Sequence, residues 1–179
     1  MSNATTETDT RSRANLRDEL IAQGLATLDL ARDVTLKYLD GIPDEHLTTR
    51  ACDGGQHALH IMGHLAFADT MILGMIAPEE AQLPDGFNEA FGKDAEIKDS
   101  ASDYPPVAAV RQEMTSIREK TRAHFAKLDE ATLLKPFEGE MAQFGRNLAH
   151  LAQTCGWHEA IHSGQLTQIR RKLDLPLIF

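Results

Sequence analysis

The sequence predicts an all-α fold, a four-helix bundle whose helices run up, down, down and up. Apolar residues recur at spacings of three and four over four long segments, which is the periodicity of amphipathic helices. The alternating pattern of a half-buried strand is nearly absent. Residues 78–105 form a connection far longer than the roughly 2–8 residues that join antiparallel helices. We therefore expect a long crossover between the second and third helices, which leaves these two helices parallel.

The first two helices are expected at residues 14–39 and 56–76. The first ends at Asp40-Gly41-Ile42-Pro43, where glycine and proline interrupt the helical pattern. The second is entered through Asp53-Gly54-Gly55, and its predicted inner face combines histidines with apolar side chains. That face contains His57, His60, Ile61, His64, Ala68, Met71 and Met75.

The third and fourth helices are expected at residues 106–128 and 144–173. The third has a nearly heptad apolar pattern from Val107 to Leu128. At about 100° per residue, the inner face of the fourth helix also mixes apolar and polar side chains. That face contains Phe144, Leu148, Leu151, Cys155, His158, His162, Gln165 and Ile169. The crossover is expected either to hold a short helix at residues 87–91 or to lie over one end of the bundle as a lid.

We expect residues 14–179 to form a single domain and residues 1–13 to be a disordered polar tail. A chain of 179 residues is long enough for one hydrophobic core, and no internal repeat is found. The tail lacks the apolar segment of a secretory signal.

The composition argues against nucleic-acid and membrane partners. With 18 Lys and Arg against 27 Asp and Glu, the net charge is −9, and an acidic surface repels phosphate backbones. No apolar run is expected to reach the roughly 20 residues of a membrane span. The two cysteines, Cys52 and Cys155, fit a reducing compartment better than a disulfide framework. The sequence therefore predicts a cytoplasmic protein.

Two pairs of histidines four residues apart, His60 with His64 and His158 with His162, lie on the inner faces of the second and fourth helices. Buried imidazoles are costly unless their nitrogens are satisfied, and a divalent metal satisfies them well. His64, His158 and His162 each lie near the middle of a helix, so facing antiparallel helices would bring them to the same depth. We predict that these three bind zinc or nickel, with iron as a further candidate, and leave one position open.

Several neighbouring residues have predicted roles. Gln165 lies on the same side of its helix as the histidines and is expected either to hydrogen-bond a metal-bound water or to orient a ligand. His60 is a candidate proton acceptor, or an additional or substitute ligand. His57 is expected to be a helix cap or a surface residue, Cys155 a buried core residue rather than a reactive thiol, and Trp157 a residue packed between helices.

The segment His158-Glu159-Ala160-Ile161-His162 matches the H-E-x-x-H motif of zinc proteases, in which Glu159 would be the general base. Those enzymes usually take a third ligand from a downstream Glu or His, and neither residue follows His162. A strand-rich region that would hold a peptide substrate is also missing. We therefore do not expect a protease, and expect Glu159 to face solvent or to form an ion pair.

The stretch Gly63-His64-Leu65-Ala66, followed by residues 158–166, His158-Glu159-Ala160-Ile161-His162-Ser163-Gly164-Gln165-Leu166, resembles the DinB-like (YfiT-like) superfamily. Residues 39–47 also resemble the link between the first two helices of that family. The resemblance covers nearly the whole chain after the tail. It implies an up-down-down-up bundle, often a homodimer, with metal ligands at the positions of His64, His158 and His162. Characterised members include metal-dependent transferases and isomerases that use low-molecular-weight thiols such as mycothiol or bacillithiol.

The histidine pattern and the resemblance together predict a metal-dependent transferase that acts on a small-molecule substrate. The metal would activate a low-molecular-weight thiol for attack on a small electrophile. One alternative is a metal-dependent hydrolase of a small molecule. The other is a non-enzymatic, metal-binding stress-response protein. A homodimer is expected in each case.

Overall fold

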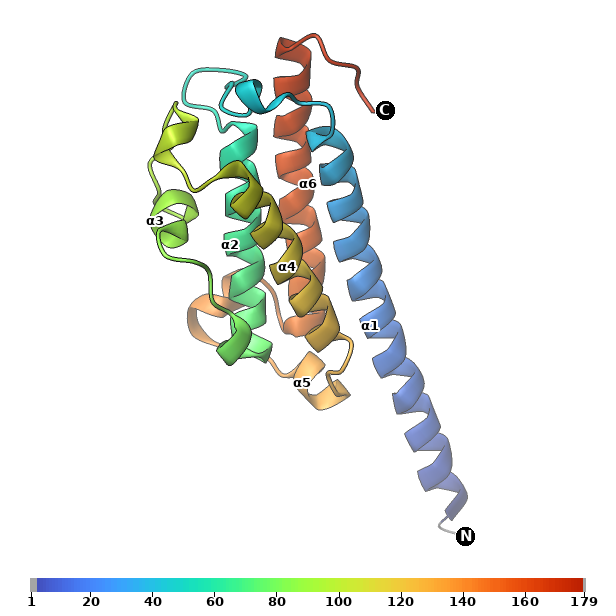
Figure 1. Cartoon of the computed structure of the whole chain (residues 1–179). Coiled ribbons are helices and arrows are strands. Elements are labelled where there is room, and N and C mark those ends of the chain that lie inside the picture. Colours follow the sequence, from blue (N-terminus) through green and yellow to red (C-terminus); the bar gives the residue numbers. More distant parts are fainter. Residues whose placement is uncertain (1–2, 179) are drawn as a thin grey trace.

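The chain is a bundle of long helices in the computed structural model, which describes residues 3–178, with side chains from residue 16 onward (Figure 1). Its α-helices are α1 (Asn3–Leu39), α2 (Ala58–Ile76), α3 (Phe87–Phe91), α4 (Val107–Phe125), α5 (Glu130–Leu134) and α6 (Leu148–Lys172). Short 3₁₀ turns are η1 (Asp44–His46), η2 (Pro78–Glu80), η3 (Ala101–Asp103) and η4 (Gly139–Gln143). Among residues 3–178 there is no strand, so the predicted all-α class is confirmed for this part of the chain.

The four long helices pack mainly in two pairs. Helix α1 lies chiefly against α6, and α2 lies chiefly against α4. In Figure 1, α1 and α6 ascend while α2 and α4 descend, an arrangement compatible with the predicted up-down-down-up order. Because α2 and α6 are antiparallel and in contact, side chains from the middle of each helix can meet in the interior.

The crossover between α2 and α4 contains the short helix α3, with the bounds predicted for it. Helix α3 lies along the side of α2 and not over an end of the bundle, so the lid alternative is wrong (Figure 1). Phe87 and Phe91 are its buried residues. Gly63 on α2 makes room for this contact, because a Cβ at that position would lie 2.3 Å from the Phe91 ring.

Helix boundaries differ most from the prediction at the starts of α1 and α6, and α4 also ends three residues early, at Phe125. Helix α1 begins at Asn3, so it continues through most of the segment expected to be a tail, and residues 1–2 lie outside the described part. The disorder of residues 1–13 in solution stays a prediction. Helix α6 begins at Leu148 and not at residue 144, because the side chain of Asn147 accepts a hydrogen bond from the His150 backbone N–H and caps the helix there. Phe144 therefore lies outside the helix.

Helix α2 is the most apolar helix of the bundle. By length and composition its 19 residues could cross a membrane, so the expectation that no apolar run approaches that length is wrong. The core helix of a bundle passes the same test, and 56% of the tested stretch is buried. Leu59, Ile61, Met62, Leu65 and Leu73 are almost completely buried against the surrounding helices. The apolar character of α2 is therefore explained by its central place in the core.

Candidate metal centre

His64 from α2 and His158 and His162 from α6 come together in the interior of the bundle. Each offers a ring nitrogen, and the three nitrogens lie within 4.8 Å of one another. The ring centroid of His64 lies 5.3 Å from that of His158 and 5.1 Å from that of His162, and the last two are 4.6 Å apart. His162 is buried and the other two are half-buried. The three residues predicted as ligands could therefore hold one metal ion.

Hydrogen bonds orient two of the three rings. The Nδ1 of His64 lies 3.1 Å from the Phe91 carbonyl oxygen, to which its N–H donates. The Nδ1 of His162 likewise donates to Oε1 of Gln165 at 2.7 Å. In these tautomers both Nε2 atoms are unprotonated, and without a metal the Nε2 of His162 accepts from the Nε2–H of His158 at 3.1 Å. Ligating histidines in metal sites are held by such second hydrogen bonds, so Gln165 lies where a ligand-orienting residue is needed.

The spacing of the nitrogens also suits a cation. The Nε2 atoms of His158 and His162 are 3.1 Å apart. Metal–nitrogen bonds of about 2.0–2.1 Å in tetrahedral geometry place two ligand nitrogens about 3.4 Å apart, which is close to this separation. Imidazole nitrogens are suitable ligands for zinc, nickel and ferrous iron. The residues present therefore fit a divalent transition metal.

Burial keeps two of these imidazoles, those of His158 and His162, in the form that a metal needs. Burial lowers the pKa of His162 to about 4, helped by the neighbouring His158 and opposed by the hydrogen bond that His162 donates to Gln165. Burial also lowers the pKa of His158, and His64 lowers it further. Both rings are therefore neutral near pH 7, and neutral imidazole is the ligating form.

His60 lies next to the triad but is not part of the group that can share an ion. Its ring stacks on that of His64, with centroids 6.0 Å apart, and its side chain is buried. Its Nδ1 has no hydrogen-bond partner among the described residues. Burial lowers the pKa of His60 to about 4, and the neighbouring His64 contributes to the same shift. The His60 ring is therefore neutral and a weak base at pH 7. Its role as a proton acceptor stays a prediction.

His57 caps helix α2. Its Nδ1 accepts a hydrogen bond from the His60 backbone N–H at 3.1 Å, and its Nε2 donates to the Lys98 carbonyl oxygen at 2.9 Å. The side chain is fully buried. The prediction of a helix cap is confirmed, and the alternative of a surface residue is wrong.

A cavity of about 450 Å³ opens beside the triad, and His64 and His158 form part of its lining. Trp157 also lines it and is 65% exposed, so the prediction that Trp157 packs between helices is wrong. Met71 and Met75, expected on the inner face of α2, are likewise exposed along this cavity.

Cys155 lies against the core clusters beside the same cavity. It is half-buried, and burial raises the pKa of its thiol to about 12. A thiol with so high a pKa is a poor nucleophile at neutral pH. The prediction that Cys155 is a core residue and not a reactive thiol agrees with this environment.

Glu159 is fully buried, and its carboxylate is occupied by two arginines. Oε1 accepts from Nε of Arg32 at 2.7 Å, and Oε2 accepts from Nη2 of Arg118 at 2.6 Å. Burial alone would raise the pKa of this carboxyl, but Arg32 and Arg118 hold it below the ordinary value. The expected ion pair is confirmed, and exposure to solvent is wrong. Glu159 is therefore not free to act as the base of an H-E-x-x-H protease.

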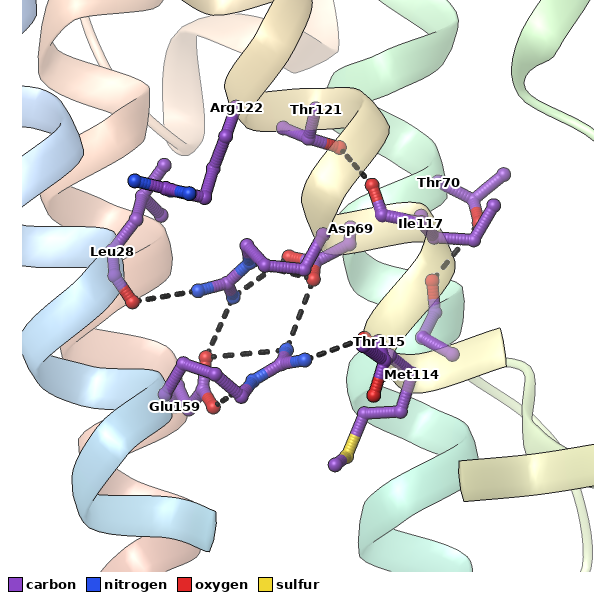
Figure 2. A network of polar contacts seen from close by, with 12 residues as sticks. Leu28, Asp69, Thr70, Met114, Thr115, Ile117, Thr121, Arg122 and Glu159 are labelled. Carbon is purple, nitrogen blue, oxygen red and sulfur yellow. Dashed lines mark hydrogen bonds and ion pairs between the residues drawn. The ribbon is translucent and has the colours of Figure 1, made fainter. Parts of the chain in front are cut away.

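The Glu159 contacts belong to a buried ionic network that sequence reasoning did not find (Figure 2). Asp69 on α2 accepts from Nε of Arg118 at 2.8 Å and from Nη2 of Arg32 at 3.0 Å. The two guanidinium groups also donate to backbone carbonyls, Arg32 to Met114 and Arg118 to Leu28. Two cations and two carboxylates from α1, α2, α4 and α6 thus balance one another in the core.

The geometry agrees with a comparison against known families. Residues 27–166 match the family model described as the DinB superfamily, and this range contains the three histidines, Gln165 and the ionic network. No curated protein matches the chain significantly.

Proposed function

Since the chain belongs to the DinB superfamily, we propose that it is a divalent-metal-dependent transferase that activates a low-molecular-weight thiol for attack on a small electrophile. The observation that carries the proposal is the convergence of three imidazole nitrogens within 4.8 Å of one another. The same observation supports zinc or nickel as the metal, with iron as a further candidate.

The histidines and Gln165 would each have a separate role in this reaction. His64, His158 and His162 would hold the cation, which when bound supplies a positive charge that lowers the pKa of a thiol. Gln165 would keep His162 in the tautomer that presents Nε2, as the Phe91 carbonyl would do for His64. His60 stays the proposed acceptor of the thiol proton, although its pKa of about 4 makes it a weak base, and solvent water is the alternative acceptor.

The broader description of the protein is also part of the proposal. We take the chain to be an up-down-down-up bundle that acts on a small molecule in the cytoplasm as a homodimer. Its net charge of −9 supports the absence of nucleic-acid partners. Neither the hydrolase nor the non-enzymatic alternative has a specific contact in its favour, so both serve as outcomes of the test.

The test combines metal analysis with an activity panel. The purified chain, stripped and reconstituted with zinc, nickel or ferrous iron, is expected to bind about one metal ion. Replacing any of His64, His158 or His162 by Ala should abolish binding, whereas His46→Ala, at an exposed position, should not. Thiol-dependent conjugation of 1-chloro-2,4-dinitrobenzene only in the metal-loaded chain supports the proposal. Thiol-independent ester hydrolysis favours the hydrolase, and metal binding without any turnover favours the non-enzymatic protein.

The pH dependence of metal retention provides a second readout. Protons compete with the metal for each imidazole, so affinity must fall as pH falls. Because the pKa of His162 is lowered to about 4 from 6.5, its proton competes only at more acidic pH than for an ordinary histidine. We therefore expect metal to be retained below the ordinary histidine value of 6.5 and to be released as the pH falls through about 4, measured by dialysis and elemental analysis. Metal retained unchanged well below pH 4 would contradict histidine ligation.

A further inference from the structure

The cavity beside the triad has an apolar wall that thiol activation does not require. Its volume of about 450 Å³ falls within the roughly 300–1,000 Å³ of typical small-molecule sites. His64 and His158 line it, so it opens directly onto the proposed metal centre. Most of the remaining lining is apolar.

Several of these apolar side chains are large and exposed. Met71 is 47% exposed, Phe144 40% and Trp157 65%. They come from α2, from the segment before α6 and from α6, yet they gather around one concave site. Exposed apolar residues that are scattered singly need no explanation, but a cluster around a cavity marks a binding surface. Methionine side chains in such a wall adapt to ligands of irregular shape.

The charge of the lining is equally informative. The ionisable side chains of the lining are the two histidines, Cys155 and Lys93. Lys93 lies two residues after the end of α3. It is exposed, and within residues 16–178 it has no ion pair or hydrogen bond. A single unpaired cation at an apolar site favours a ligand with one negative charge. One lysine is too little for a phosphorylated or multiply charged ligand.

We propose that this cavity binds the electrophile, and that the electrophile has an apolar body and one carboxylate that pairs with Lys93. The assignment rests on the proposed function, because it leaves the metal centre to the thiol. A low-molecular-weight thiol of the mycothiol type is polar, and an apolar wall would leave its polar groups unsatisfied. The cavity therefore matches the second substrate in its chemistry.

Trp157 allows binding to be measured without turnover. It is the only tryptophan of the chain, it lines the cavity, and it is largely exposed. In the metal-free protein, 4-phenylbutyrate should bind saturably and shift the Trp157 emission to shorter wavelength as the indole is covered. The neutral analogue 4-phenylbutan-1-ol should bind about threefold more weakly, since an exposed ion pair contributes modestly. Lys93→Gln should remove this difference.

A matched pair of variants locates the binding. Met71→Glu places a charge in the apolar wall and should weaken 4-phenylbutyrate binding by about tenfold or more. Leu36→Glu makes the same kind of change at a residue of similar exposure, 43% against 47%, that does not line the cavity, and it should have no effect. Equal binding by the two variants, or no saturable binding by the wild-type chain, would overturn the proposal. Equal affinity for 4-phenylbutyrate and 4-phenylbutan-1-ol would overturn the inference that the ligand carries a carboxylate that pairs with Lys93.

Metal titration of the same samples tests the cavity assignment separately from the proposed metal-dependent function. Loss of ligand binding in Met71→Glu while metal binding is kept supports the cavity assignment. A wild-type chain that binds 4-phenylbutyrate in this way but takes up no metal contradicts the proposed function alone. A chain that binds metal but not 4-phenylbutyrate contradicts the cavity assignment alone.

Discussion

At the scale of single residues, the hydrogen bond between His162 and Gln165 orients one ligand of the proposed metal centre before any metal binds. Gln165 lies one helical turn after His162, and its Oε1 is 2.7 Å from Nδ1. The contact fixes both the rotation of the ring and the position of its proton, so Nε2 is the nitrogen that faces the other two histidines.

Replacing Gln165 by Leu should weaken metal affinity by about 10–100-fold, because His162 loses the acceptor that orients it. Gln165→Glu keeps an acceptor and should retain affinity. Gln153→Leu is the matched control, since Gln153 lies on the same helix but pairs with Thr27. Competition titrations with a chromophoric chelator measure all four proteins. If Gln165→Leu and Gln153→Leu bind metal equally well, the orienting role is wrong.

The ligands could be predicted from sequence, whereas their orientation could not. His158 and His162 are one turn apart on an apolar stripe, and the sequence alone contains that information. The acceptor for His64 is a backbone carbonyl, that of Phe91, which every residue has and no sequence pattern marks. The neutral state of His60 and His162 depends on burial by distant elements, so it too required coordinates.

At the scale of elements, the contact between α2 and α3 positions one side of the proposed site. Helix α3 supplies the Phe91 carbonyl that accepts from His64, and the Phe91 ring packs directly over Gly63. The glycine is one residue before the histidine, so the packing contact and the hydrogen bond are made by the same short stretch of α2. The absence of a side chain at Gly63 is therefore what allows His64 to be held.

Gly63→Ala should lower stability by about 1–3 kcal/mol, because its Cβ would overlap the fully buried Phe91 ring. It should also weaken metal affinity, since moving Phe91 disturbs the acceptor of His64. Gly74→Ala on the same helix is the control: its Cβ would meet Ala81 at an ordinary 3.6 Å. Because alanine is the better helix former, this variant should gain up to about 1 kcal/mol. Urea unfolding measures both, and equal stability of the two variants would contradict the packing argument.

The boundaries and faces of the elements could be predicted only in part. The end of α1 at Leu39 follows from the glycine and proline after it. The start of α6 carried a readable signal, the Asn147 cap, but the apolar Phe144 ahead of it suggested a longer helix. A helical wheel also placed Met71 inward, although it is 47% exposed beside the cavity, because periodicity does not distinguish a core from the wall of a binding site.

At the scale of the whole molecule, the buried ionic network joins all four long helices at one point. Arg32, Asp69, Arg118 and Glu159 come one each from α1, α2, α4 and α6, and all four are at most 7% exposed. The sequence gives no sign of this, because a charged residue in a helix usually faces solvent and the partners are far apart along the chain. Since Glu159 follows His158 directly, the network also fixes how α6 is placed against α2 beside the metal centre.

The network is stable only while its two buried guanidinium groups face two buried carboxylates. Glu159→Gln keeps the shape of the side chain but leaves two buried guanidinium groups facing one carboxylate, that of Asp69. Breaking a buried pair in this way costs about 3–5 kcal/mol, because the remaining charge cannot be solvated. We therefore expect the metal-free chain to unfold at much lower urea concentration, with weaker metal binding in the protein that still folds.

A control variant and a compensating variant distinguish the loss of charge balance from a general destabilisation caused by any substitution. Glu119→Gln, at an exposed position on α4, should change stability by less than about 0.5 kcal/mol. Arg32→Leu combined with Glu159→Leu removes one charge of each sign and leaves Asp69 with the two hydrogen bonds from Arg118, so it should be more stable than Glu159→Gln alone. If Glu159→Gln is no less stable than Glu119→Gln, or if the double variant is the least stable of the three, charge balance is not what joins the four helices.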